Sequence, residues 1–237
     1  GGAVTLDKSA YSGFIGQISG TGTNTCTSVP REMIEKLGLK GSRGMLVNLE
    51  SGMYDGIESG DFDLLLDRES NNPGDKDFEK KTAGVYLGEL CRLMLLSAGE
   101  EGFISPASLE KARALGHIDS SVIDAWSAGE GLDKIAACPA DADFVRELSL
   151  SLFQRSARCM CVNLLAIARL IGAGREADRP VCVCAEGSLV QRSHHYRPVL
   201  EKLLETEGRE KLGLHFLLLV GSETTLPGSA AAALLNC

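Results

Sequence analysis

The sequence has no excess of positive charge and no long hydrophobic run. Its 237 residues include 24 Lys and Arg against 32 Asp and Glu, a formal net charge of −8. Nonspecific nucleic-acid binding depends on basic residues that release counterions from phosphates, so we expect no nucleic-acid partner. The most apolar run near the C-terminus, 212–220, contains Gly213 and His215. It is far shorter than the roughly 20 residues of a spanning helix, so we expect no membrane partner.

Paired C-x-x-C motifs are also absent. The eight cysteines include two Cys-x-Cys pairs, at 159–161 and 182–184, both inside apolar stretches. In a strand, Cys182 and Cys184 would share a face, whereas a helix would point Cys159 and Cys161 in different directions. A zinc cluster needs better spacing, so we expect no metal ligands in the chain. The pattern favours buried thiols in the reducing cytosol, and hence a cytoplasmic protein.

The chain does not begin with Met, and no signal of basic and then apolar residues opens it. A strand pattern follows within a few residues of Gly1. We therefore expect that sequence upstream of Gly1 is missing.

Strand and helix patterns alternate along the chain. Period-two alternation and short apolar runs predict strands at 12–19, 45–49, 181–185 and 215–220. Helical stripes and caps predict helices at 72–96 with Asn72 as the N-cap, from Ser105 onwards, at 120–126, 131–137, from Asp141 to 170, at 196–204 and at 228–236. The acidic stretch 50–69 is expected to be a solvated, loop-rich face. This order favours one α/β domain.

Gly20-Thr21-Gly22-Thr23-Asn24 follows the first predicted strand. Glycines allow close backbone approach, and N–H groups with threonine hydroxyls can hold phosphate oxygens. Taken alone this signal is weak, and an ordinary hairpin turn is the better explanation of the segment. No Gly-Lys-Ser/Thr follows, so the Walker pattern fails, and no third glycine opens a helix.

Four ordered segments resemble the motifs of the hexokinase family. They are the Gly-Thr-Gly-Thr-Asn-Thr-Cys run at 20–26, Asn48-Leu49-Glu50-Ser51-Gly52, the stretch 67–92 with Asn-Pro-Gly, Phe-Glu-Lys and Tyr-Leu-Gly-Glu-Leu-Cys-Arg, and Glu186-Gly187-Ser188 before a basic, His-rich segment. Their order is that of the family, and the resemblance spans essentially the whole chain. We assign no role to His194 and His195.

The resemblance implies the fold and a set of site residues. The fold would be α/β, a ribonuclease-H-like (actin/hexokinase) mixed sheet flanked by helices, with 1–237 forming the large domain only. The residues implied to bind the sugar are Asn24, Glu50 and Glu79, whereas Thr21, Gly22, Gly187 and Ser188 are implied to contact the phosphates of ATP.

The implied activity is phosphorylation of a glucose-like hexose at its 6-hydroxyl, with ATP and Mg²⁺ as cofactors. The family's Asn-Asp-Thr motif, whose Asp is the general base, does not occur in the chain. We therefore expect the base and the small domain to lie upstream, and this chain alone to be inactive. Departures from the family pattern at Ser51, Val85 and Glu186 leave open an alternative, a noncatalytic hexokinase-like sugar sensor.

Overall fold

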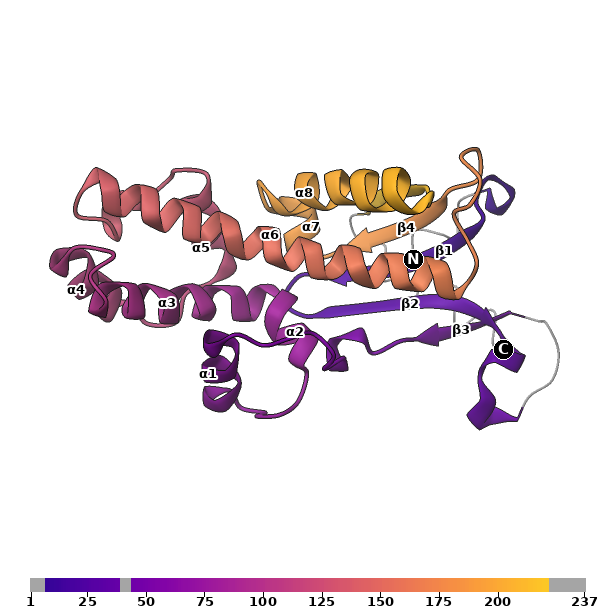
Figure 1. The fold of residues 1–237 in the computed structure, drawn as a ribbon, viewed down its shortest axis with the longest axis horizontal. Coiled ribbons are helices and arrows are strands. Elements are labelled where there is room, and N and C mark those ends of the chain that lie inside the picture. The colour runs from indigo at the N-terminus through magenta and orange to yellow at the C-terminus, as the bar shows by residue number, and fades with distance from the viewer. Residues whose placement is uncertain (1–6, 39–43, 222–237) are drawn as a thin grey trace.

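A five-stranded mixed sheet forms the centre of the described structure (Figure 1). The structure is a computed structural model, which describes residues 7–38 and 44–221. The strands are β1 (Gly13–Ser19), β2 (Thr23–Pro30), β3 (Gly44–Asn48), β4 (Val181–Glu186) and β5 (Phe216–Val220). They are arranged in the order β3-β2-β1-β4-β5. The helix predicted at 228–236 lies outside the described residues.

The first three strands form an antiparallel meander, and the last two are parallel to β1. β1 and β2 pair antiparallel with Ser19 opposite Thr23, so Gly20–Gly22 is the turn between them. β1 and β4 are parallel, with Ile15 opposite Val183. Between β1 and β4 the chain forms β2, β3 and the helices from residue 61 to residue 170. This parallel pair is therefore joined by a long crossover connection and not by a tight turn.

Eight α-helices are described. They are α1 (Asp61–Glu69), α2 (Asp77–Thr82), α3 (Gly84–Glu100), α4 (Pro106–Ala114), α5 (Ser120–Ser127), α6 (Pro139–Leu170), α7 (Ser188–Arg192) and α8 (Tyr196–Leu203). Short 3-10 helices span Lys8–Ala10, Arg31–Met33, Glu35–Leu37, Ser51–Met53 and Leu132–Lys134, and a π-helix spans Leu204–Lys211. The predicted class, a mixed α/β sheet flanked by helices, is confirmed.

One face of the sheet packs against α6 and α8 (Figure 1). On this face, Ile15 and Val183 are completely buried. Asn163 of α6 donates to Thr25 Oγ1, and the Tyr196 hydroxyl of α8 hydrogen-bonds Ser19 Oγ at 3.0 Å. The Tyr196 ring fills the core with no exposed area, and its burial raises the pKa of its hydroxyl. The sequence alternation of β1 thus gives one buried and one more open sheet face.

Four predictions differ from the structure. No strand is predicted over β2, because its alternating positions are mostly Thr and Ser rather than aliphatic residues. The helix predicted at 131–137 is only a 3-10 helix at Leu132–Lys134. The helix predicted from Asn72 is two helices: Asn72 lies in a turn, α2 begins at Asp77, and the chain is extended at Ala83 before α3. The long helix begins at Pro139 and not at Asp141, whose carboxylate accepts bonds from Ser105 instead of capping its own helix.

The longest helix, α6, carries charged residues on its exposed side. None of the helices in the described part of the chain is both long and apolar enough to cross a membrane.

Candidate functional site

Asn24, Glu50 and Glu79 come from three separate elements and line one pocket of about 280 Å³. Asn24 lies on β2, Glu50 follows β3, and Glu79 lies on α2. The antiparallel pairing of β2 with β3 places Asn48 beside Cys26, so Glu50 lies close to Asn24. The structure therefore brings together the three side chains that the family resemblance implies as sugar ligands.

Hydrogen bonds fix the orientation of the Asn24 amide. Its Nδ2 donates to Asn48 Oδ1 at 3.0 Å and to Glu50 Oε1 at 3.3 Å. Its Oδ1 accepts from the backbone N–H of Thr25 at 2.7 Å and of Ser51 at 3.1 Å. These bonds fix which side of the Asn24 amide carries the nitrogen and which the oxygen, and they hold the Glu50 carboxylate beside it.

Glu79 is positioned by the turn that begins β2. The Thr23 backbone N–H donates to Glu79 Oε2 at 3.1 Å, and Thr82 Oγ1 donates to Thr23 Oγ1 at 3.1 Å. The Lys76 ammonium donates to Glu79 Oε1 at 3.2 Å. This contact raises the pKa of Lys76 above its usual value. Each carboxylate oxygen keeps an acceptor site free, since an ionised carboxylate offers about four lone-pair sites.

Backbone strain is concentrated at this pocket. Among the described residues, the non-glycine residues with positive φ are Glu50 (φ 49°) and Lys76 (φ 56°), and both line it. A left-handed conformation costs a residue with a Cβ of order 1 kcal/mol. Such strain gathers at binding sites, where it fixes side-chain directions.

A second pocket, of about 500 Å³, lies on the other side of the β1–β2 turn. Thr21 and Ser188 line this pocket, whereas Gly22 lines the first. The turn therefore separates the two pockets. The Gly84 N–H, at the start of α3, donates to the Gly20 carbonyl at 2.7 Å and ties the turn to the helices.

Gly187 brings the turn after β4 against the turn after β1. Its φ is 112°, and a Cβ there would lie 2.4 Å from the Ser19 carbonyl oxygen. Only glycine fits, because a side chain would collide with backbone. Gly187 itself is not among the residues that line the pocket; its role in the structure is to let Ser188 approach Gly20.

Several residues that line the pockets were not predicted. In the first pocket the unpredicted charge is Lys76, which in sequence looks like one more solvated lysine. The second pocket is walled by His117, Asp119, Ser120, Ser121, Asp124 and Arg192, among others. No sequence motif marks these residues; only the packing of α5 against the α7 region brings them together. His194 is engaged structurally, with its Nδ1 2.8 Å from Asp124 Oδ2.

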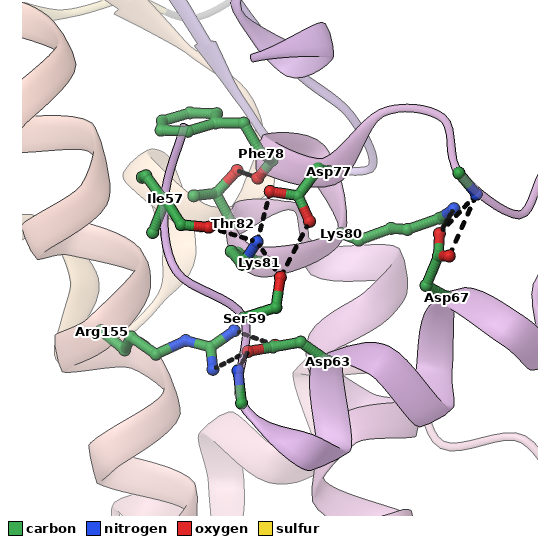
Figure 2. A network of polar contacts seen from close by, with 12 residues as sticks. Ile57, Ser59, Asp63, Asp67, Asp77, Phe78, Lys80, Lys81, Thr82 and Arg155 are labelled. Carbon is green, nitrogen blue, oxygen red and sulfur yellow. Dashed lines mark hydrogen bonds and ion pairs between the residues drawn. The ribbon is translucent and has the colours of Figure 1, made fainter. Parts of the chain in front are cut away.

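An ionic network with Lys81 as its most buried member supports α2 (Figure 2). Lys81, 1% exposed, donates to Ser59 Oγ at 2.8 Å and to the Ile57 carbonyl at 3.1 Å, and pairs with Asp77. Arg155 of α6 forms a two-pronged pair with Asp63, at 2.6 and 3.2 Å. The expectation of a solvated, loop-rich face at 50–69 is therefore wrong in part, because α1 is helical and Asp63 is buried.

Known proteins similar to this chain are hexokinases and hexokinase-like proteins. A sequence model of the hexokinase family matches residues 14–235. The Hexokinase-like 1 protein of Arabidopsis thaliana is 29% identical, over 94% of this chain and 49% of its own length. Hexokinase-1 of Rattus norvegicus is 32% identical, over 80% of this chain and 22% of its own length.

The structural comparison identifies the same fold. A hexokinase from Schistosoma mansoni, in complex with glucose, aligns with a TM-score of 0.76 at 21% identity, over 99% of this chain and 55% of that one. The expected actin-like sugar-kinase fold is confirmed. The chain spans about half the length of the Arabidopsis relative and of the solved hexokinase, and less of the rat one. With a family match across almost all of its residues, this chain belongs to the hexokinase family.

Proposed function

We propose that this chain is the large-domain part of a hexokinase that phosphorylates a glucose-like hexose at its 6-hydroxyl with ATP. The observation that carries the proposal is the convergence of Asn24, Glu50 and Glu79 in one pocket beside the glycine turn. Three residues far apart in sequence supply two carboxylates and an amide at one place.

The first pocket suits a polyhydroxylated ring. A hexose presents adjacent hydroxyl donors, and an ionised carboxylate can accept two of them at once. Asn24 adds an amide whose orientation the neighbouring residues already fix. A site that pairs every hydroxyl rejects ligands that lack one, because buried polar groups are then left unpaired.

The second pocket suits the phosphates of ATP. The close approach of the Gly20 and Gly187 turns leaves no room for a Cβ, and the Thr21 and Ser188 hydroxyls line the cavity at that point. Arg192 adds a positive charge to the same wall. In this assignment Thr21 and Ser188 contact the phosphates, Gly187 allows Ser188 to approach the Gly20 turn, and Gly22, which lines the first pocket, lies next to the transferred group. Mg²⁺, bound with ATP, would neutralise the charge on that group.

The general base would come from a part of the protein outside this chain. An Asn-Asp-Thr motif does not occur in the 237 residues. Phosphoryl transfer needs the sugar hydroxyl in line and its proton accepted. A small domain upstream would supply that group and cover the exposed Glu50 side of the pocket, which excludes water.

The experiment is a glucose titration of this chain by calorimetry, together with a coupled glucose–ATP assay. We expect glucose binding without turnover. In Glu79→Gln, we expect affinity to fall at least about tenfold, because hydrogen bonds to a charged acceptor contribute about 1.5–3 kcal/mol. The control is Glu58→Gln, an exposed carboxylate that does not line the pocket.

Equal glucose affinity in Glu79→Gln and Glu58→Gln would contradict the assignment of the pocket. Turnover by this chain alone would contradict the proposal that its base lies elsewhere. Glucose binding by the full-length protein with no turnover would favour the sugar-sensor alternative.

A further inference from the structure

Two thiols outside both pockets lie against each other on β4. The sulfurs of Cys182 and Cys184 are 3.8 Å apart and in hydrogen-bond contact. Residues two apart in a strand share a face. The register pairs Cys182 with Phe14 and Cys184 with Gly16, so the thiols lie on the sheet face opposite Ile15 and Val183, away from α6.

The two sulfurs have different surroundings. Cys182 is completely buried, whereas Cys184 is half-buried. The hydrogen bond from the Cys182 thiol lowers the pKa of Cys184 below its usual value, and it raises the pKa of Cys182. The thiolate is the nucleophilic form of cysteine. Cys184 is thus the accessible and more acidic member, with a second thiol directly behind it.

Gly16 lies between Cys184 and a third thiol. It is the partner of Cys184 in β1. On its other side, the Cys26 sulfur of β2 lies 2.5 Å from where a Cβ of residue 16 would be, so this sulfur fills the space that a side chain would take. Access of a small reagent to Cys184 therefore depends on the exposed part of the half-buried Cys184 side chain itself.

We propose that Cys182 and Cys184 are a modification site, at which hydrogen peroxide oxidises the two thiols to a reversible intrastrand disulfide. The Cys184 thiolate attacks the peroxide, the O–O bond breaks, and a sulfenic acid forms with release of water after protonation. The Cys182 sulfur then attacks the sulfenic sulfur, the S–O bond breaks, and a second water leaves. Two thiols are oxidised to one disulfide and one peroxide is reduced to two waters.

The bond that forms is a reducible one. Cα atoms two residues apart in a strand are about 6.6 Å apart, near the upper end of the roughly 4.4–6.8 Å that disulfides span. The sulfurs must also move from 3.8 Å to about 2.0 Å apart. Strained disulfides are more readily reduced than structural ones, so thiol reductants return the pair to its starting state.

The test treats the intact chain with increasing hydrogen peroxide, denatures it, and alkylates the remaining thiols with iodoacetamide before peptide mass analysis. We expect the peptide that contains both residues to escape alkylation and to lose two hydrogens, and dithiothreitol to reverse this. Cys138, which is exposed, is the internal reference thiol. In Cys182→Ser, we expect Cys184 to stop as a sulfenic acid that dimedone traps.

The peroxide titration of wild-type protein tests the proposal without any variant, so a variant that misfolds does not obscure that result. The proposal is overturned if Cys138 oxidises at lower peroxide than the pair, or if Cys184 forms its disulfide with Cys26. It is also overturned if Cys182→Ser and Cys184→Ser trap dimedone equally, because the two thiols would then be equivalent.

Discussion

At the scale of single residues, Glu50 and Lys76 show how the first pocket is shaped. Both carry a positive φ without being glycine, and both direct charged side chains into one cavity. Lys76 and Glu79 neutralise each other on one side, while Glu50 is held by the amides of Asn24 and Asn48. The negative charge of Glu79 is thus balanced by the Lys76 ammonium, whereas Glu50, within the described part of the chain, accepts hydrogen bonds from neutral amides only.

Glu50→Gly separates binding from stability. Glycine adopts the left-handed conformation without a Cβ penalty, so we expect the free energy of unfolding to stay level or to rise by up to about 1 kcal/mol. Glucose affinity should fall at least about tenfold, because a charged acceptor is lost. Urea denaturation and calorimetric titration measure the two effects.

Glu50→Gln is the matched control, since it keeps both the backbone conformation and the side-chain length. Its unfolding free energy should lie at or below that of Glu50→Gly. A loss of more than about 1 kcal/mol in Glu50→Gly would mean that the Glu50 side chain stabilises the fold rather than the ligand.

At the scale of elements, α2 is a six-residue helix whose position depends on charges behind it. A helix this short is not stable alone, so tertiary contacts must hold it. Lys80 bonds Asp67 at 2.6 Å and the Asn72 carbonyl at 2.7 Å, and Lys81 binds the 57–59 segment. These contacts fix the direction of Glu79, which projects toward the pocket.

Lys81→Met should destabilise the chain by about 3 kcal/mol, because it leaves the Asp77 carboxylate and the Ile57 carbonyl without their buried partner. Adding Asp77→Asn should recover part of this loss, since the unpaired charge is then removed. Urea denaturation of the two single variants and the double variant gives the coupling energy. Lys134→Met, at an exposed lysine, should be nearly neutral; a similar loss there would refute the argument.

Asp141 joins α4 to α6 and predicts a pH dependence. Burial opposes its ionisation, but the hydroxyls of Ser105 and Ser108, each at 2.6 Å, outweigh it and lower the pKa of Asp141 to about 2. The unfolded value is about 3.9. The ionised carboxylate therefore stabilises the fold fully above about pH 4, and this stabilisation is lost as the pH falls through about 2.

The measurement is the difference in unfolding free energy between wild type and Asp141→Asn. Between pH 6 and pH 3 this difference should shrink by about 1 kcal/mol. Asp143→Asn, at an exposed position of the same helix, should show no such trend. A constant difference for Asp141→Asn across this range would rule out the linkage.

At the scale of the whole molecule, the order of the four family motifs predicted the fold, whereas hydrophobic periodicity predicted the individual strands and helices less completely. The strands that became β1, β3, β4 and β5 follow from apolar alternation, and the convergence of Asn24, Glu50 and Glu79 follows from the family's motif order. Strand β2 carries little apolar signal, because three of its four inward residues are threonines, of which Thr27 donates to the Phe14 carbonyl of β1. The break at Ala83 depends on a tertiary contact, the bond from the Gly84 N–H to the Gly20 carbonyl, which no local pattern encodes. Lys76 pairs locally with Glu79, but its place in the pocket depends on how α2 packs against β2 and the segment after β3.

The turn of three residues between β1 and β2 has one further consequence. Thr21 faces one cavity and Gly22 the other, so neighbouring peptide units, with Cα atoms about 3.8 Å apart, set the distance between the two sites. Covalent geometry, unlike a flexible side chain, does not adjust to substitution. Evolution can vary the chemistry of either cavity by changing its lining, but an insertion or deletion in this turn would alter the spacing of the two cavities themselves.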